Sequence, residues 1–397
     1  MSDAQEPATP TRRSRRKPAA KRTAAAKAEA PAQPTGEAPV APPATSAAEK
    51  HGRFHNKRLW KPKGKKVVNL AFQGGGSHGA FTWGVCDRLL QDPTFEIEGI
   101  TGTSAGAMNA TVLAYGHALG GNDGARTALD GFWHAVAESA RFSPYQRTPL
   151  DRMTGSWALD NSPGYQVMDL IGRMFSPYDL NPSGTNPLRK VLEAHVDFEF
   201  LRRNSRIKVF LNAVNVRSGK LKQFTDQDLT ADAVLASGCL PFMFHAVEIE
   251  GEHYWDGGYC GNPALYPLIY HCDSPDILLV QINPMHREEL PRSARAILDR
   301  VNEISFNSSL MREMRAIKFV SDLIDQGKLS EEDYVKLHVH MIESDELTAF
   351  GASSKLNAEF DFLLTLKELG RQTAESWLKQ HWDRVNVESS CDLQVFL

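Results

Sequence analysis

Short apolar runs alternate with stretches of helical spacing along most of the chain after residue 66. The run at 67–72 predicts a buried strand, and the glycine-rich stretch 73–79 predicts a tight turn after it. Apolar residues at helical spacing over 80–91 and a second apolar run over 97–103 follow, and another helix is expected after residue 104. This strand, helix, strand, helix order predicts a parallel sheet with helices on its faces.

The same alternation continues toward the C-terminus. Residues 141–187 are rich in Pro, Tyr, Arg and Gly, which predicts irregular structure with short helices that covers a pocket. A long amphipathic helix over 293–324 and a helical close over 355–381 are expected. Further strands are expected at 207–214, 220–224, 246–250, 277–282 and 337–342. We therefore predict an α/β fold, a three-layer sandwich with a central, largely parallel sheet between helices.

The composition is typical of a folded protein without a membrane-spanning segment. Of the 397 residues, 42% are hydrophobic and 23% are charged. No uninterrupted apolar run approaches the roughly 18 residues that are needed to span a bilayer. The five cysteines form no C-x-x-C pair, so we expect reduced thiols, no zinc site and a cytoplasmic location.

The first 66 residues differ from the rest in charge. They carry 16 Lys and Arg against 5 Asp and Glu, although the net charge of the whole chain is −3. Because residues 1–62 lack hydrophobic periodicity, we predict a disordered basic tail there and one folded domain over 63–397. The basic cluster at 12–22 favours peripheral association with an anionic membrane or granule surface. An organelle transit peptide and a solvated tail of no specific role are alternatives, whereas nucleic-acid binding is not favoured.

The most informative motif is Gly102-Thr103-Ser104-Ala105-Gly106, a G-x-S-x-G between a predicted strand and a predicted helix. A serine on such a sharp turn exposes its Oγ, and the following helix directs its positive N-terminal end at developing negative charge. The flanking Gly102 and Gly106 tolerate the tight backbone. Ser104 is therefore the candidate nucleophile.

A second glycine-rich turn, Gly74-Gly75-Gly76-Ser77-His78-Gly79, follows the first predicted strand. It also fits the dinucleotide-binding pattern G-x-G-x-x-G, with Glu96 or Glu98 at the spacing of a ribose-binding acid. Both acids precede or open the second strand, whereas a ribose-binding acid belongs at the carboxyl end of that strand. Beside Ser104, the same backbone N–H groups would form an oxyanion hole instead.

A serine nucleophile also needs a base, and Asp256-Gly257-Gly258 contains the strongest candidate. We expect Asp256 just past an aromatic strand end. The two glycines would allow a sharp turn that brings its carboxylate close to another segment. The alternative is a histidine base, because His245 and His253 flank this motif.

Together the three motifs resemble the signature motifs of patatin-like phospholipases, in the family's order. The segment 236–241 is also similar to the small-residue segment before the family's aspartate. The resemblance covers 66–285 well and the C-terminal helical region 290–397 more loosely. It implies a Ser–Asp dyad of Ser104 and Asp256, and it implies neither a metal nor an organic cofactor. It also implies an oxyanion hole from Gly74, Gly75 and Gly76, with His78 and Gly79 in the same motif.

His78 departs from the family pattern, which usually carries Arg or Lys at this place. We expect a group there that titrates near neutral pH instead of a fixed cation, and hence an activity sensitive to pH between about 6 and 7. On this interpretation, His78→Arg leaves hydrolysis intact or improves it.

These observations predict a serine acyl hydrolase, a phospholipase or lipid acyl hydrolase, that cleaves lipid esters through an acyl-serine intermediate. A thioesterase or a storage-polyester depolymerase would share every catalytic residue. Two hypotheses of a different class are a nucleotide-binding oxidoreductase and a non-catalytic lipid-binding protein, which would tolerate Ser104→Ala. Five apolar residues are candidates to line the acyl pocket: Phe142, Tyr145, Trp157, Met174 and Phe175.

Overall fold

Five parallel strands form the centre of an eight-stranded sheet. The computed structural model describes residues 64–330 and 333–396, so the predicted tail over 1–62 lies outside the described residues. In spatial order the parallel strands are β3 Lys208–Asn215, β2 Phe95–Thr103, β1 Lys66–Phe72, β7 Asp276–Val280 and β8 His338–Ile342.

An antiparallel extension continues the sheet beyond β3. Strand β6 (Glu252–Asp256) pairs with β3 and with β5 (Val247–Ile249), and β4 (Leu221–Thr225) also pairs with β3. Asp256 is the last residue of β6 rather than a residue just past a strand. The register pairs Asp256 with Ala213 of β3, one strand away from β2.

Alternate side chains of the central strands enter two separate cores. In β1, Val68, Leu70 and Phe72 join one core with residues of α1, α2 and α12, whereas Ala71 joins a second core with residues of α9 and α10. Burial on both faces explains why β1 and β7 are mostly apolar in the sequence. A sheet between two helical layers confirms the predicted three-layer sandwich.

The longer helices are α1 Gly79–Leu89, α2 Ala105–Ala140, α10 Ala294–Asp325 and α12 Phe360–His381; the shorter ones are α6 Pro187–His195, α7 Phe198–Asn204, α8 Ala231–Ser237, α9 Tyr266–His271 and α11 Glu346–Ala349.

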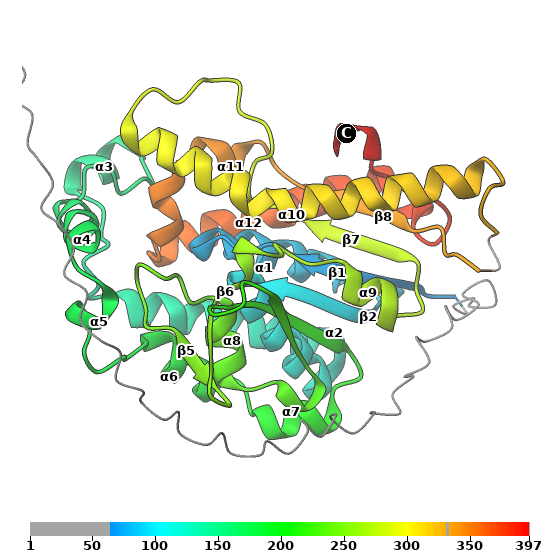
Figure 1. Cartoon of the computed structure of the whole chain (residues 1–397), viewed down its shortest axis with the longest axis horizontal. Coiled ribbons are helices and arrows are strands. Elements are labelled where there is room, and N and C mark those ends of the chain that lie inside the picture. The colour runs from blue at the N-terminus through cyan, green and yellow to red at the C-terminus, as the bar shows by residue number, and fades with distance from the viewer. Residues whose placement is uncertain (1–63, 331–332, 397) are drawn as a thin grey trace, which may run out of the picture. The chain divides into compact units, whose positions relative to one another are not determined.

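Residues 141–187 contain the expected short helices, α3 (Pro149–Thr154), α4 (Pro163–Met174) and α5 (Pro177–Leu180). Each begins with Ser or Thr at the N-cap and Pro next to it, and the cap side chain accepts a backbone hydrogen bond. The Ser or Thr side chain satisfies a backbone N–H that has no partner within the helix, and the proline fixes φ in the first turn. Figure 1 shows α3, α4 and α5 on the side toward which the arrowheads of β2 and β7 point.

Helix α2 follows residue 104, as predicted, and continues to Ala140. It bends at Gly120 and Gly121, where the backbone leaves helical geometry. Within 64–330 and 333–396, no helix combines the length and apolarity that crossing a bilayer requires.

Candidate active site

The two glycine-rich turns meet at the carboxyl ends of β1 and β2. These strands are parallel neighbours, so the turns that follow them lie at the same edge of the sheet. The contact is close: a Cβ atom on Gly74 would lie 2.6 Å from Ser104 Cβ and 2.8 Å from the Thr103 carbonyl oxygen. Any larger residue at position 74 would therefore push the two turns apart.

Ser104 lies on a strained elbow between β2 and α2. Its backbone has φ 56° and ψ −122°, a left-handed conformation that non-glycine residues rarely adopt, and the residue is partly exposed. The elbow needs glycine on both sides, because a Cβ on Gly102 would lie 2.4 Å from the Gly106 carbonyl oxygen. A Cβ on Gly106 would lie 2.3 Å from the Phe72 carbonyl oxygen.

A chain of buried hydrogen bonds supports the backbone at Ser104. The Ser104 N–H donates to Ser237 Oγ at 3.0 Å, and that hydroxyl donates to the Asn212 carbonyl oxygen at 2.6 Å. The Asn212 amide also donates to the hydroxyls of Thr101 and Thr103, both at 3.1 Å. Ser237 belongs to the small-residue segment noted in the sequence, whereas no sequence motif marked Asn212.

Asp256 reaches Ser104 from the end of β6. Its carboxylate accepts a hydrogen bond from the Gly258 N–H at 2.7 Å, and hydrogen bonding with the Ser104 side chain lowers the pKa of this carboxyl group. Its own N–H donates to the Cys239 carbonyl oxygen at 2.8 Å. Gly257 is required for this approach, because a Cβ there would lie 2.2 Å from the Asn212 carbonyl oxygen.

The environment of Asp256 makes its carboxyl group more basic than usual. The residue is 2% exposed. Burial raises the pKa of Asp256 to about 6, although the hydrogen bonds from Gly258 and Ser104 oppose this rise. The carboxylate is therefore ionised at neutral pH and can accept a proton from the hydroxyl that it touches.

The turn after β1 offers two of the three expected N–H groups to the site. The Gly74 N–H donates to Asn262 Oδ1 at 2.6 Å and so is already satisfied. The N–H groups of Gly75 and Gly76 have no partner among the described residues, and Gly75 is partly exposed while Gly76 is exposed. Gly76 has φ 60°, and a Cβ there would lie 2.3 Å from the Lys355 carbonyl oxygen.

Gly79 has a packing role at the crossing of α1 and α2. A Cβ at this position would lie 2.7 Å from Ala105 Cβ. Its carbonyl oxygen accepts a hydrogen bond from the Asn109 amide of α2 at 2.9 Å. Gly79 thus allows the first turn of each helix to lie side by side.

His78 does not titrate near neutral pH, contrary to the expectation from its sequence. The residue is 2% exposed, and its Nε2 lies 2.7 Å from Ser354 Oγ. That hydroxyl donates to the Gly351 carbonyl oxygen, so His78 Nε2 carries the proton, and the buried Nδ1 has no partner among the described residues. Burial first, and then the charges of Lys355 and Arg287, lower the pKa of His78 to about 3.

The sequence predicted that His78→Arg leaves hydrolysis intact or improves it, but from the structure we expect this substitution to destabilise the protein. The guanidinium would be buried beside aromatic rings and two cations, which should lower the free energy of unfolding by about 3 kcal/mol or more. Thermal unfolding measures this effect. His134→Arg is the matched control, because the His134 side chain on α2 is 55% exposed. Equal unfolding temperatures for the two variants would contradict the assignment.

Several other predicted residues lie apart from Ser104 and Asp256. His245 contacts the Pro177 carbonyl oxygen at 3.1 Å through Nε2, and His253 approaches Glu248 at 3.8 Å. No contact of either histidine with Ser104 or Asp256 is found in the described part of the chain. The structure thus favours the carboxylate over a histidine as the partner of Ser104.

The predicted acyl-pocket residues divide into two groups. Trp157 packs between the Arg147 guanidinium and the Phe362 ring, so it belongs to the core layer beside α12. Phe142 and Met174 are 92% and 70% exposed. Phe175 is also 49% exposed, and Tyr145 packs against Tyr165 of α4.

The acidic residues of the dinucleotide hypothesis do not reach the glycine turn. Glu98 accepts hydrogen bonds from Lys208 Nζ at 2.9 Å and from the backbone of the 273–274 turn at 2.8 Å. Lys208 is the first residue of β3 and the 273–274 turn precedes β7, so these contacts lie at the opposite ends of the strands from the glycine turns. In the described ranges, no group of His, Cys, Asp and Glu side chains could hold a metal ion.

The fold and the site define an α/β protein with a strained serine at a strand-to-helix elbow and a buried aspartate beside it. The sequence model of the patatin-like phospholipase family matches residues 70–269, and the chain belongs to this family. No curated protein sequence matches the chain.

Two similar solved structures are the crystal structure of VipD from Legionella pneumophila and that of the type III effector protein ExoU. VipD is 16% identical with a TM-score of 0.33, over 84% of this chain and 79% of VipD. ExoU is 17% identical with a TM-score of 0.28, over 80% of this chain and 54% of ExoU. Both TM-scores are low, so the family assignment rests on the sequence match.

Proposed function

We propose that this protein hydrolyses acyl esters of lipids through an acyl-Ser104 intermediate, with Asp256 as the base. One observation carries the proposal: the Ser104 side chain interacts with the buried Asp256 carboxyl group, and the neighbouring turn presents two N–H groups that have no partner among the described residues. A hydroxyl next to a base and an oxyanion site are the parts that acyl transfer requires.

In the first half-reaction, Ser104 Oγ attacks the ester carbonyl carbon as its proton passes to Asp256. The carbonyl oxygen becomes an oxyanion, which the N–H groups of Gly75 and Gly76 and the N-terminal end of α2 stabilise. The tetrahedral intermediate collapses, the bond to the alcohol oxygen breaks, and Asp256 returns the proton to that leaving oxygen. The products of this step are the free alcohol and the acyl-Ser104 ester.

In the second half-reaction, water attacks the acyl-Ser104 carbonyl carbon. Asp256 accepts a proton from this water and then gives it to Ser104 Oγ as the acyl–oxygen bond breaks. A free carboxylic acid leaves, and the enzyme is restored. A pKa of about 6 for Asp256 suits both roles, because the group is a stronger base than an ordinary carboxylate and yet ionised at neutral pH.

The exposed surface of α4, on the side toward which β2 and β7 point (Figure 1), supports a lipid substrate. Helix α4 has no buried residue, and its Val167, Leu170 and Met174 are between 54% and 70% exposed. Exposed apolar side chains on neighbouring turns of one helix suit contact with acyl chains or a bilayer surface. The basic composition of residues 1–62 supports peripheral association with an anionic surface as part of the same proposal.

A fluorophosphonate probe tests the proposed nucleophile directly. We expect the probe to form a covalent adduct on the peptide that contains Ser104, because the activated hydroxyl attacks phosphorus as it would an ester carbonyl. Mass spectrometry of the wild type, Ser104→Ala and Ser218→Ala locates the adduct. Ser218 is an exposed turn serine and serves as the control. An active wild-type protein that remains unmodified at Ser104 would refute the proposal.

Profiling with substrates separates the related activities. A phospholipase, a thioesterase and a storage-polyester depolymerase would share the same residues, so only relative kcat/KM values for phospholipid, thioester and polyester substrates can distinguish them. The apolar surface of α4 and the family membership both favour the phospholipid.

A further inference from the structure

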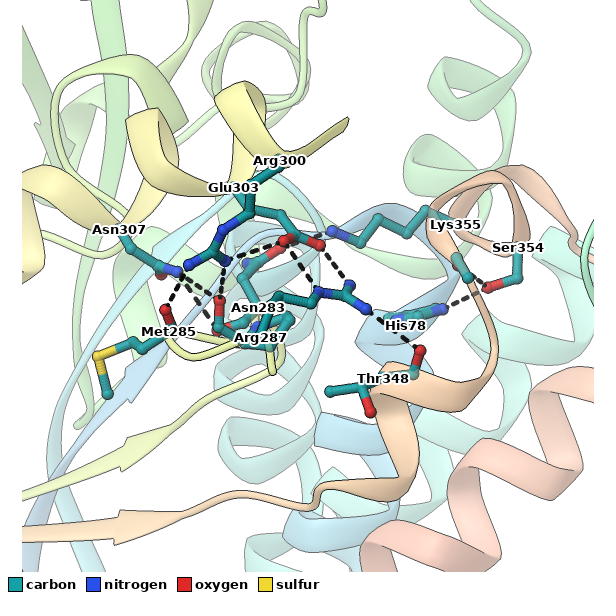
Figure 2. Close-up of polar contacts among 12 residues, drawn as sticks. His78, Asn283, Met285, Arg287, Arg300, Glu303, Asn307, Thr348, Ser354 and Lys355 are labelled. Atoms are coloured by element: carbon teal, nitrogen blue, oxygen red, sulfur yellow. Dashed lines mark hydrogen bonds and ion pairs between the residues drawn. The ribbon is translucent and has the colours of Figure 1, made fainter. Parts of the chain in front are cut away.

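Figure 2 shows three cationic side chains, Arg287, Arg300 and Lys355, in the region of His78, which belongs to the glycine turn that follows β1. Arg287 and Arg300 both bind Glu303 of α10, at 2.6 Å and 3.2 Å. The Glu303 side chain is only 5% exposed, so it is held deep in the protein by these two guanidinium groups. Lys355 lies on the other side of the group and contributes the third cation.

Lys355 touches the glycine turn through both its backbone and its side chain. The Lys355 carbonyl oxygen occupies the space that a Cβ on Gly76 would need. The Lys355 ammonium donates to Asn283 Oδ1 at 2.8 Å, and the Asn283 amide donates to the Gly74 carbonyl oxygen at 2.6 Å. Asn283 and Gly74 therefore connect the ammonium to the turn that carries the free N–H groups.

Asn283 also fixes the residue before the turn. Its backbone N–H donates to Gln73 Oε1 at 2.9 Å, and the Ile282 N–H donates to the same oxygen at 2.9 Å. A Cβ on Gly75 would lie 2.8 Å from Ile282 Cδ1 and 3.8 Å from Asn283 Oδ1. Asn283 Oδ1, which accepts the hydrogen bond from Lys355, therefore lies next to Gly75, whose N–H has no partner among the described residues.

The charge of Lys355 is not cancelled by a direct partner. Within 64–330 and 333–396, no ion pair of Lys355 is found, and Glu303 is shared by the two arginines. His78, which lies in the same turn, is uncharged. Positive charge beside the turn would favour an anion that forms at the Gly75 and Gly76 N–H groups.

We propose that Lys355 is a positioning residue for acyl transfer: through Asn283 it holds the glycine turn open toward Ser104, and its charge favours the oxyanion. This inference rests on the proposed function. Lys355 lies 86 residues beyond the end of the family match at residue 269, so it is a contribution of the C-terminal region.

The electrostatic part of the proposal has a pH signature. Burial lowers the pKa of the Lys355 ammonium below its ordinary value; Glu303 and Asp299 of α10 oppose this change, and Arg287 adds to it. Because the cation is the form that favours the oxyanion, kcat should decline at alkaline pH as Lys355 loses its proton. An arginine stays charged at every pH of the assay and should remove this decline.

The test compares Lys355→Met, Lys355→Arg and the control Lys367→Met on a soluble ester. Lys367 lies on α12, where its ammonium donates to Asp130 at 2.8 Å and lies 4.0 Å from the centre of the Trp83 ring. We expect Lys355→Met to lower kcat roughly tenfold to a hundredfold with KM within about twofold. Lys355→Arg should keep most of the activity and lose the alkaline decline, and Lys367→Met should behave as the wild type.

Each outcome separates this inference from the proposed function. If Ser104→Ala is inactive but Lys355→Met has the kcat of Lys367→Met, Lys355 has no such role while the nucleophile stands. If the alkaline decline persists unchanged in an active Lys355→Arg, the charge effect is refuted. If Ser104→Ala retains the wild-type kcat, the proposed function fails and the role of Lys355 fails with it. Lys355→Arg decides the matter even where Lys355→Met does not fold.

Discussion

Ser104→Ala is expected to lower kcat/KM for ester hydrolysis by about ten-thousandfold, with residual activity from the oxyanion site and substrate binding alone. The variant removes the hydroxyl oxygen that is the nucleophile in the proposed mechanism. It leaves the elbow backbone in place, because the Ser104 N–H and not its hydroxyl binds Ser237. The measurement is steady-state hydrolysis of a short-chain ester together with thermal unfolding.

The unfolding temperature decides how the loss is interpreted. Alanine at position 104 keeps the Cβ that packs against Gly74, so we expect the folded state to be retained. A fully active and folded Ser104→Ala would exclude the covalent mechanism and favour a non-catalytic lipid-binding role or a different nucleophile.

Asp256→Asn is expected to lower kcat by about a thousandfold, since an amide cannot accept the Ser104 proton. In the wild type, kcat/KM should fall as pH decreases through about 6, because protonated Asp256 is not a base. The residual activity of the variant should lack this acid limb. Rate measurements from about pH 4.5 to about pH 9, in steps of about half a pH unit, test both statements.

The same substitution should raise stability at neutral pH. Folding raises the pKa of Asp256 from an unfolded value of 3.8 to about 6, so the ionised carboxylate opposes folding by about 3 kcal/mol above pH 6. Below about pH 4 the group is protonated in both states and this cost is absent. Asp256→Asn should therefore unfold at a higher temperature than the wild type at about pH 8 but not at about pH 4. If Asp256→Asn is inactive because it is misfolded, it should instead unfold at a lower temperature than the wild type at about pH 8.

The sequence predicted the central elements of the fold because each carries its own local pattern. Strand β1 is a mostly apolar run that only Asn69 interrupts after its first residue, and each turn after a strand carries glycines at the positions where backbone segments lie too close for a Cβ. The antiparallel strand β6 was harder to delimit, since its five residues include a histidine, a glutamate and the aspartate itself. Its position in the sheet is fixed by pairing with β3, which no local pattern reveals.

The sequence likewise predicted some residues of the candidate site and missed others. The sequence indicated Ser104, Asp256 and the glycine turn, and the structure brings the three together. It did not indicate Asn212, Asn283 or Lys355, because each supports the site through contacts across 70 or more residues of sequence, without a motif of its own. His78 was misjudged for a related reason. A histidine's titration depends on burial, and the residues that bury His78 come from α12 and the 350–354 segment.

The pairing of β7 with β1 sets a limit on how far the chain can be shortened. A fragment that stops where the family match ends, at residue 269, would lack β7, β8 and α12. Strand β1 would then become an open sheet edge with unpaired backbone groups, and the apolar face of α1 would lose its cover. Such an edge invites pairing between copies of the fragment and aggregation. Residues beyond 269 therefore supply the strand that pairs with the free edge of β1, the strand that leads into the glycine turn.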